Sequence, residues 1–557
     1  MQAPRTIASV AGALCVLLTA TACTSGTSGT SGSGAGPGPR AHKLTLTTPA
    51  ATGALDSVTW NLPMGEPTTL DSARVADYSP STVKANLCDS LLRLKPDYST
   101  GPGLATSWSR PDATTLVLNL RKGVRFWNGH PMTSHDVVTS LLRQKDPATR
   151  SVNASLLTHV RTIAATGPHQ VTVRFTAPDE MFLKSLATSF GTVNEAAYLK
   201  KAGRSYGSAR GGLMCTGPFE LTAWKPGESL TATRNAHYWD AALRPKVTTL
   251  TFKFITDSST LTSALLSGQV DGSYEIGSSG ARALSASDVG TVHYGPSAQT
   301  NFISAIGPGS PLADHKIVQA LSLVLDRDAL IKNVYDGAAQ QLKTFIPPLV
   351  WQHGPASAVY AKGNDALPAV PAVDVDRAKK LVAQARTKRR TLTVAVPAGD
   401  QQSQQTLTFL QAGAERIGIE VVIKQLQPTQ MSGLFFDASL RKGLDATMVM
   451  GYVEIPDPVS YAQLLTAPKS LFNWTNYRNS KATSLLDQAQ ATMRPAESAA
   501  LFTRAQALYS KDLPVVPLAS PHERMFLNKR LSGAPASFAY LNMPWAAYLG
   551  GTGKDAS

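Results

Sequence analysis

The stretch Leu120–Ser140, LRKGVRFWNGHPMTSHDVVTS, constrains the fold of this chain more than any other. The apolar run Leu116–Leu120 leads into it and predicts a largely buried strand. Asn128-Gly129 is a turn dipeptide, because Gly adopts a positive φ without steric cost and Asn tolerates it. Thr133 and Asp136 have the spacing of a capping box, which predicts the start of a helix. A strand, a turn and a capped helix are therefore expected to follow one another directly.

A series of short motifs surrounds this stretch and continues along the chain. They are Gly65–Asp71 (GEPTTLD), Ala105–Trp108 (ATSW), Leu120–Phe126 (LRKGVRF), Thr133–Val137 (TSHDV), Cys215–Phe219 (CTGPF), Arg234–Trp239 (RNAHYW), Ser267–Asp271 (SGQVD) and Pro311–Asp314 (PLAD). In this order they resemble the signature of family 5 solute-binding proteins, the peptide- and nickel-type receptors of ABC importers. His135 and Cys215 depart from the residues usual in the family. The resemblance covers Trp60 to Trp545.

This resemblance implies an α/β fold of the periplasmic-binding-protein type (type II, class C). In that fold two ligand-gripping lobes close about a hinge, and an extra lobe accompanies them. A chain of 557 residues exceeds what one hydrophobic core usually supports, which agrees with several lobes. The expected organisation is a signal peptide (1–23), a flexible tether (24–54), the first part of lobe I (55–95), lobe II (96–211), the second part of lobe I (212–298), lobe III (299–512), and a return to lobe I with a C-terminal tail (513–557).

Hydrophobic spacing predicts individual elements within these lobes. Val83–Leu92 carries apolar residues at helical intervals. Leu392–Val396, Leu407–Ile417 and Glu420–Leu426 indicate a strand, a helix and a strand, which should form a right-handed parallel βαβ unit. Val515–Leu518 is expected to lead back to lobe I.

The N-terminus predicts export. Arg5 supplies a positive charge, Thr6–Ala22 is apolar, and Ala20–Cys23 resembles a lipobox whose cysteine is lipidated. We therefore expect Cys23 to anchor the protein at the outer face of the cytoplasmic membrane. The Gly- and Ser-rich residues that follow indicate a flexible tether. The alternative is an ordinary secretory signal with an incidental cysteine.

Two further cysteines remain, Cys88 and Cys215. The resemblance places both in lobe I, and an exported protein matures where disulfides can form. We expect these two cysteines to pair, with buried free thiols as the alternative.

The formal charge of +15 does not by itself indicate nucleic-acid binding. Its basic residues are scattered, and the one dense cluster, Arg386–Arg390, has no interleaved aromatic residues. We expect the charge to reflect solubility and an anionic cell surface rather than recognition.

A search for catalytic constellations finds only fragments. Ser81-Thr82-Val83-Lys84 fits the Ser-x-x-Lys motif of penicillin-interacting enzymes, but its partner motifs are absent. His130 and His135 lack the spacing of a zinc site. We expect no enzyme activity, no metal site and no cofactor. The alternative function is a secreted cell-wall serine hydrolase that uses Ser81 and Lys84.

The resemblance instead implies that a ligand binds between lobes I and III. In peptide receptors of the family a buried carboxylate meets the ligand's amino group, and the corresponding loop here is Gly451–Pro458. Glu454 is the candidate for that carboxylate and Asp457 the second choice. The other candidate ligand contacts are aromatic or polar residues near the expected lobe edges: Tyr78, Tyr274, Asn301, Phe302, Tyr452 and Trp474. The expected partners are a peptide or similar small solute and an ABC permease, with the protein itself a monomer; the substrate and the particular permease stay open.

Overall fold

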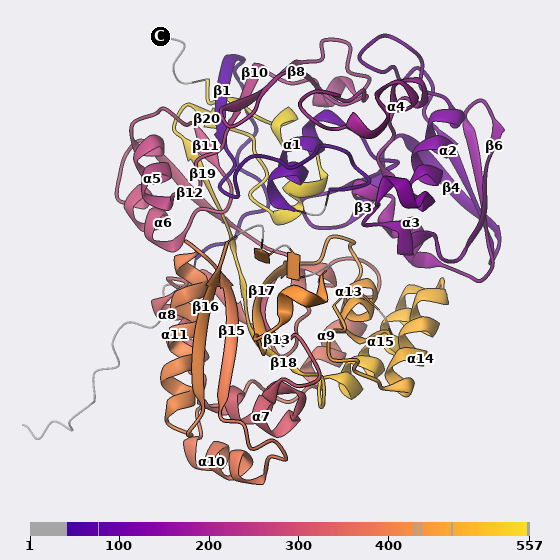
Figure 1. Ribbon diagram of the computed structural model, residues 1–557. Helices are drawn as coiled ribbons and strands as arrows, with labels where there is room; N and C mark the ends of the chain where they lie inside the picture. Colours follow the sequence, from indigo (N-terminus) through magenta and orange to yellow (C-terminus); the bar gives the residue numbers. More distant parts are fainter. Residues whose placement is uncertain are drawn as a thin grey trace, which may run out of the picture. The chain divides into compact units, whose positions relative to one another are not determined.

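The computed structural model describes residues 42–75, 77–427, 430–431, 433–434, 437–468, 470 and 472–553. The predicted signal peptide, Cys23 and the first part of the predicted tether lie outside these residues. Three β-sheets organise the described part, and the helices pack around them (Figure 1). We keep the names lobe I, lobe II and lobe III for these three sheets with their helices.

Lobe I is built on a seven-stranded sheet whose strands come from three separate stretches of the chain. Its order is β12-β19-β11-β1-β10-β9-β8, and β1 runs parallel to β10 and β11. The strands are β1 (Leu55–Asn61), β8 (Phe219–Lys225), β9 (Ser229–Arg234), β10 (Val247–Lys253), β11 (Gly272–Ser273), β12 (Gly290–Gly295) and β19 (Glu523–Asn528). The helices are α1 (Tyr78–Leu87), α5 (Ser258–Leu266) and α6 (Ser278–Ser285), and a small hairpin joins β20 (Leu531–Ser532) to β21 (Gly550–Gly551).

Lobe II is built on a four-stranded antiparallel sheet with the order β4-β5-β7-β6. Its strands are β4 (Ala105–Asp112), β5 (Thr115–Leu120), β6 (Val160–Gly167) and β7 (Gln170–Phe175), and its helices are α2 (Ser134–Leu142), α3 (Glu180–Ser185) and α4 (Ala196–Ala202). The strand predicted before Leu120 is confirmed as β5. The predicted helix start is confirmed too, because Oδ2 of Asp136 accepts a hydrogen bond from the backbone N–H of Thr133 at 2.8 Å.

Lobe III is built on a six-stranded sheet with the order β14-β18-β13-β17-β15-β16. Its strands are β13 (Gln299–Ala305), β14 (Ala339–Gln341), β15 (Thr391–Pro397), β16 (Glu420–Leu426), β17 (Ala446–Tyr452) and β18 (Val515–Pro521). Its helices are α7 (His315–Val324), α8 (Arg327–Asn333), α9 (Ser357–Asp365), α10 (Val375–Gln384), α11 (Gln401–Glu415), α13 (Pro458–Thr466), α14 (Ser480–Ala491) and α15 (Pro495–Tyr509). The predicted βαβ unit is confirmed as β15, α11 and β16, and the two strands are parallel.

Two sequence expectations are corrected by the strand pairing. The strand β18 pairs with β13 and β14, so it belongs to lobe III, and the chain returns to lobe I at residue 522 rather than at 513. The helix expected to reach Leu92 ends at Leu87, because Leu92–Leu94 forms β2 and pairs with β3 (Thr100–Pro102). Apolar residues at helical intervals do not distinguish a longer helix from a helix followed by a buried strand.

Within lobe I, the end of α1 is joined to the segment by which the chain returns from lobe II, through a disulfide and buried hydrogen bonds. Cys88, which directly follows α1, is bonded to Cys215. The carboxylate of the next residue, Asp89, is buried and accepts hydrogen bonds at 2.8–2.9 Å from Thr216, Tyr238 and Trp239. The motif segments CTGPF and RNAHYW therefore meet the end of α1, and their polar side chains satisfy the carboxylate of Asp89.

A second carboxylate ties lobe I to lobe II. Asp71, the last residue of the GEPTTLD motif, accepts two hydrogen bonds from the guanidinium of Arg143 at 2.6 and 2.8 Å. Arg143 follows α2 of lobe II directly. Because such a bidentate pair is directional, it fixes the orientation of the two segments as well as their contact.

We expect the double substitution Cys88→Ala with Cys215→Ala to lower the free energy of unfolding by about 2–4 kcal/mol. The two cysteines are 127 residues apart, so the bond removes much conformational freedom from the unfolded chain. Denaturant unfolding of the oxidised protein and the double variant measures the difference. Reduction should destabilise the wild type and leave the double variant unchanged; equal midpoints for oxidised wild type and variant would contradict the expectation.

Candidate functional site

The candidate site lies where the loop after β17 of lobe III meets α1 of lobe I. Three aromatic rings from distant parts of the chain come together here. The ring of Tyr78, at the start of α1, lies 4.9 Å from that of Tyr452 and 5.9 Å from that of Phe538, measured between ring centroids. The rings of Tyr452 and Phe538 are 5.5 Å apart. The structure therefore brings together two of the predicted ligand contacts, Tyr78 and Tyr452.

The loop that follows Tyr452 is bonded to lobe II and to the segment that leads into it. The hydroxyl of Tyr98 donates to the carbonyl oxygen of Val453 at 2.7 Å, and Ser189 Oγ donates to Oε1 of Glu454 at 2.9 Å. Farther along, Lys184 forms an ion pair with Asp457. Lobe III is thus held against this side of the molecule by one hydrogen bond or ion pair from each of three residues.

The two carboxylates predicted for this loop have different surroundings. Asp457 is 2% exposed; besides the ion pair with Lys184, its Oδ1 accepts the backbone N–H of Val459 at 2.7 Å and caps the start of α13. These contacts give Asp457 a structural role. Glu454 is half-buried, and only one of its two oxygens accepts a hydrogen bond from a described residue, Ser189.

Near Glu454, α1 presents the two residues of the Ser-x-x-Lys motif. Ser81 lies one helical turn before Lys84, so both side chains are on the same face of α1. Ser81 is close enough to Tyr452 to act on the pKa of its hydroxyl, which burial raises. Lys84 is 1% exposed, and burial lowers the pKa of its ammonium group to about 8, although the nearby Glu454 carboxylate acts in the other direction. The charges of Glu454 and Lys84 therefore act on each other.

A second group of charges lies on the lobe I side. Burial raises the pKa of the Glu523 carboxyl to about 7, and it also raises the pKa of Glu275, whose carboxyl is close enough to be affected by the charge of Glu523. Oε1 of Glu523 accepts the backbone N–H of Glu275 at 2.8 Å. Arg524 crosses to lobe III, where it donates to Oε1 of Gln402 at 2.9 Å. Both carboxyls therefore hold a proton more readily than an exposed glutamate does.

The remaining predicted contacts lie within single lobes. Tyr274 is 2% exposed, its ring stacks on that of Tyr540 at 3.7 Å, and its hydroxyl donates to the carbonyl oxygen of Pro535. Asn301 donates to the hydroxyl of Tyr335 at 3.0 Å, and Phe302 packs against Phe345 within the core. Trp474 packs against Phe472 and under the guanidinium of Arg441.

Only some residues of this site could be recognised from the sequence. It drew attention to Ser81 and Lys84 through a catalytic motif, and Glu275 directly follows a predicted residue. Tyr98, Ser189 and the pair Glu523-Arg524 carried no motif, because only the folded chain brings them beside the loop.

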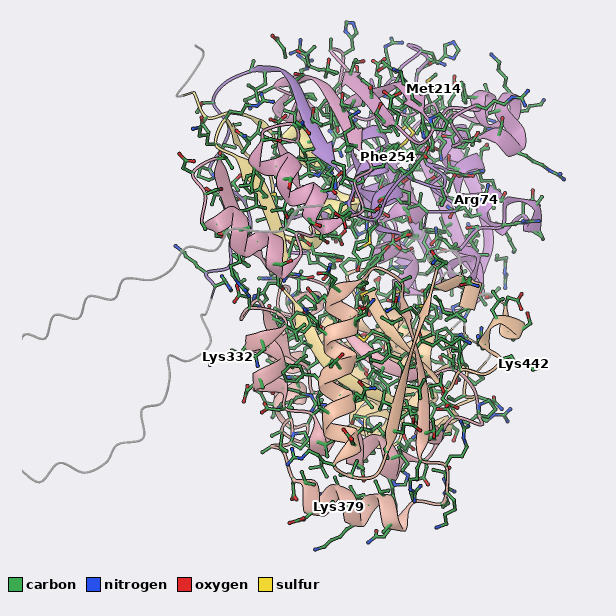
Figure 2. The ribbon with its side chains drawn as sticks, turned by 60° about the vertical axis from the view of Figure 1, so that its left-hand side comes forward. Arg74, Met214, Phe254, Lys332, Lys379 and Lys442 are labelled. Atoms are coloured by element: carbon green, nitrogen blue, oxygen red, sulfur yellow. A yellow bond between two sulfur atoms is a disulfide. The ribbon has the colours of Figure 1, made fainter. Side chains whose placement is uncertain are left out.

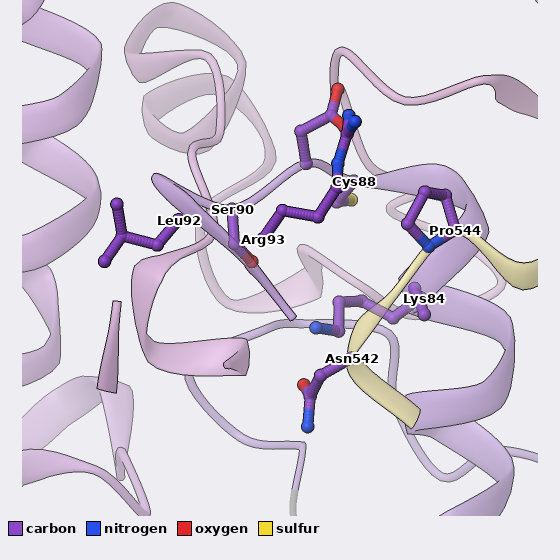
Figure 3. Close-up of a pocket in the computed structure, with 9 residues that line it drawn as sticks. Lys84, Cys88, Ser90, Leu92, Arg93, Asn542 and Pro544 are labelled. Carbon is purple, nitrogen blue, oxygen red and sulfur yellow. The ribbon is translucent and has the colours of Figure 1, made fainter. Parts of the chain in front are cut away.

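Two pockets lie beside this region. A pocket of about 10 Å³ is lined by Lys84, Asp89, Arg93 and Asn542 among others (Figure 3). A larger one, of about 170 Å³, is lined by residues of the segment 92–184 and by Thr492, Met493, Pro495 and Ser498 of lobe III. Among the described residues no group of three or more His, Cys, Asp or Glu side chains is arranged to hold a metal ion.

Exposed lysines and the character of the helices bear on the expectations about nucleic acid and membrane. The lysines Lys332, Lys379 and Lys442 are exposed and project in different directions from lobe III (Figure 2). These three lysines therefore do not form a single basic patch. None of the helices in the described part of the chain has the length and apolar character of a membrane span.

Comparison with known proteins identifies the family. Residues 99–473, well over half of the chain, match the family described as bacterial extracellular solute-binding proteins, family 5. The glutathione-binding protein GsiB of Shigella dysenteriae serotype 1 is 24% identical over 81% of this chain and 86% of its own length.

Solved structures show the same fold. The DppA protein of Helicobacter pylori in complex with the peptide STSA has a TM-score of 0.77 and is 21% identical, covering 90% of this chain and 99% of that one. The AgaA protein from A. tumefacien R10 in complex with agropinic acid has a TM-score of 0.76 and 21% identity over 89% and 98% of the two chains. The predicted type II periplasmic-binding-protein fold is therefore confirmed.

The comparisons give no support to the alternative function, a serine hydrolase at Ser81. The matched family and the relatives named above are binding proteins. The Ser-x-x-Lys motif thus stands in a binding fold, on the face of α1 that meets lobe III.

We expect Glu523→Gln to stabilise the protein at pH 8 relative to the wild type, by about 1–3 kcal/mol, and to change little at pH 5. A carboxyl whose pKa is raised by folding stabilises the fold fully below its ordinary pKa of about 4.3, and this contribution is lost as the pH rises through about 7. The neutral amide has no such dependence.

Urea unfolding at the two pH values measures the difference, with the exposed Glu228→Gln as the control. A difference between Glu523→Gln and the wild type that is the same at pH 5 and pH 8 would contradict this expectation.

Proposed function

Because this chain belongs to the bacterial extracellular solute-binding proteins of family 5, we propose that it captures a peptide or a similar small solute between lobes I and III and delivers it to the permease of an ABC importer. The observation that carries the proposal is the site where α1 of lobe I meets the loop after β17 of lobe III. Lobe I contributes Tyr78, Ser81 and Lys84, and lobe III contributes Tyr452 and Glu454. It combines aromatic surface with a half-buried carboxylate that keeps one oxygen free of hydrogen bonds to the described residues.

Two crossings of the chain supply the hinge for such a protein. The segment 296–298 joins β12 to β13, and residue 522 joins β18 to β19. They run side by side, because β12 pairs with β19 on the lobe I side and β13 pairs with β18 on the lobe III side. Short paired crossings of this kind allow two lobes to rotate while each sheet stays intact. A ligand that touches both lobes then favours the closed state.

The N-terminal export signal and lipid anchor are part of the proposal. The N-terminal segment serves as a lipoprotein signal, Cys23 carries the lipid, and the Gly- and Ser-rich tether lets the lobes reach the permease. The family is extracellular, which agrees with this arrangement.

The ligands of similar proteins support the proposed substrate class, a peptide or similar small solute. Glutathione, the peptide STSA and agropinic acid all carry carboxylates together with other polar groups.

The proposal is tested with a panel of small solutes. We expect the purified protein to show a rise in melting temperature with at least one of tri-alanine, Ser-Thr-Ser-Ala and glutathione, and to release that solute chemically unchanged, because binding stabilises only the folded state. Thermal unfolding followed by mass spectrometry of the recovered solute measures both. Turnover of the solute, or no stabilisation across a broad panel that also includes opines and metal chelates, would contradict the proposed function.

For a solute that binds through an ammonium group we expect Glu454→Gln to weaken binding by about 2–5 kcal/mol, as loss of one partner of a buried charge pair does. Calorimetry with the tightest binder of the panel measures the change. The N-acetylated form of the same solute should bind the wild type and the variant alike. An affinity that Glu454→Gln leaves unchanged would remove Glu454 from the site.

A further inference from the structure

The first residues that the structure describes form a strap along lobe I. We call residues 42–53 the N-terminal strap; in sequence it lies at the end of the segment expected to be a tether. Three of its backbone N–H groups donate to carbonyl oxygens of lobe I: that of Thr45 to Tyr294 at 2.7 Å, that of Thr48 to Ala534 at 3.0 Å, and that of Thr52 to Gly551 at 3.0 Å. Because these bonds are spread along its length, the strap is fixed to lobe I.

His42, at the start of the strap, also contacts lobe III. Its ring stacks on that of Tyr294, the last residue but one of β12, with the ring centroids 3.8 Å apart. Its Nε2 lies 2.8 Å from the carbonyl oxygen of Asp336, in the turn between α8 and β14 of lobe III. Because a carbonyl oxygen can only accept, Nε2 carries a proton and is the donor. The side chain of His42 therefore joins the two lobes.

The turn that His42 contacts is held from the lobe I side by further groups. The guanidinium of Arg282 in α6 lies 3.5 Å from the carboxylate of Asp336. The backbone N–H of His522, the residue that joins β18 to β19, donates to the carbonyl oxygen of Ala338 at 2.9 Å. Asp336 has a φ of +54°, which is unfavourable for a residue with a side chain, so its conformation depends on such contacts. In Figure 1, α6 and α8 lie at the left on the two sides of this boundary.

The strap contact and the contacts at the candidate site belong to one arrangement of the lobes. At the site, the ring of Tyr78 in lobe I meets that of Tyr452 in lobe III. The strap is fixed to lobe I and the turn belongs to lobe III. A rotation about the crossings at 296–298 and 522 that parts the two tyrosines therefore also moves His42 relative to Asp336. A hydrogen bond needs a donor–acceptor distance of about 2.7–3.2 Å, so a small displacement breaks this one.

We propose that the N-terminal strap is a catch on the hinge. The hydrogen bond from His42 to the carbonyl of Asp336 holds lobes I and III in the closed arrangement, and its loss shifts the chain toward an open one. The proposal rests on the hinge of the proposed function and assigns to it a residue outside the candidate site. In sequence the strap follows the segment that starts at the predicted lipid anchor, Cys23, so the catch lies at the end of the chain by which the protein is proposed to be anchored.

The substitution His42→Phe tests the catch, because phenylalanine can stack on Tyr294 but has no N–H to donate. We expect the ligand-free full chain with His42→Phe to have a larger radius of gyration than the wild type, since its lobes are apart for more of the time. Small-angle X-ray scattering measures the radius. Lys43→Ala, at the exposed neighbouring position, is the matched control and should scatter as the wild type does. His42→Gln keeps a donor and should give an intermediate radius.

The same substitution should weaken solute binding. One hydrogen bond changes the ratio of closed to open molecules by roughly two- to tenfold. The affinity for a solute that needs the closed arrangement then falls by up to the same factor. Calorimetry with Ser-Thr-Ser-Ala measures this for the wild type, His42→Phe and Lys43→Ala.

The outcomes separate the catch from the proposed function. Equal radii for His42→Phe and the wild type would overturn the catch, whether or not a solute binds. A lower melting temperature of His42→Phe with an unchanged radius would overturn it too, and would limit His42 to a role within lobe I. Equal affinities of these two proteins for Ser-Thr-Ser-Ala would also count against it. Failure of the whole solute panel contradicts the proposed function instead, and the comparison of radii still decides the catch.

Discussion

Buried carboxylates at the junctions of the chain are the interactions on which this structure depends. Asp71 pairs with Arg143 between lobes I and II, and Asp89 is satisfied by three donors beside the disulfide. Asp271 accepts two hydrogen bonds from Arg530 and so fixes β11 to the segment after β19. A buried carboxylate is stable only when its partners are in place, so each of these groups requires that segments distant in sequence meet correctly.

The boundary with lobe III is held differently. Its contacts with lobes I and II include single hydrogen bonds such as that from Ser189 to Glu454 and that from Arg524 to Gln402, together with the ion pair between Lys184 and Asp457. The single hydrogen bonds are individually worth little, and only the ion pair involves a buried carboxylate, that of Asp457. This contrast suits a protein in which lobes I and II form one body and lobe III moves about the paired crossings at 296–298 and 522.

The Ser-x-x-Lys motif illustrates how one residue pattern serves different chemistry. In an enzyme, a buried lysine with a lowered pKa one turn after a serine would act as a base. In this chain the same pair lies on α1, within reach of the charge of Glu454, in a binding fold. The local spacing is the same in both cases, and the difference lies in what the rest of the chain places opposite it.

The sequence by itself determined the fold class, the strand, turn and capped helix around Leu120–Ser140, and the βαβ unit of lobe III. The fold class follows from the resemblance of the motifs to those of the family, and the local elements follow from periodicity and from turn and capping residues. Motif aspartates such as Asp71 and Asp271 have structural roles. Only the tertiary structure decided where α1 ends, that β18 belongs to lobe III, and that Tyr274 lies in an aromatic core and Lys84 is buried. Strand pairing and the environment of a buried charge depend on residues hundreds of positions away in the sequence. The local spacing of residues does not predict which distant residues these are.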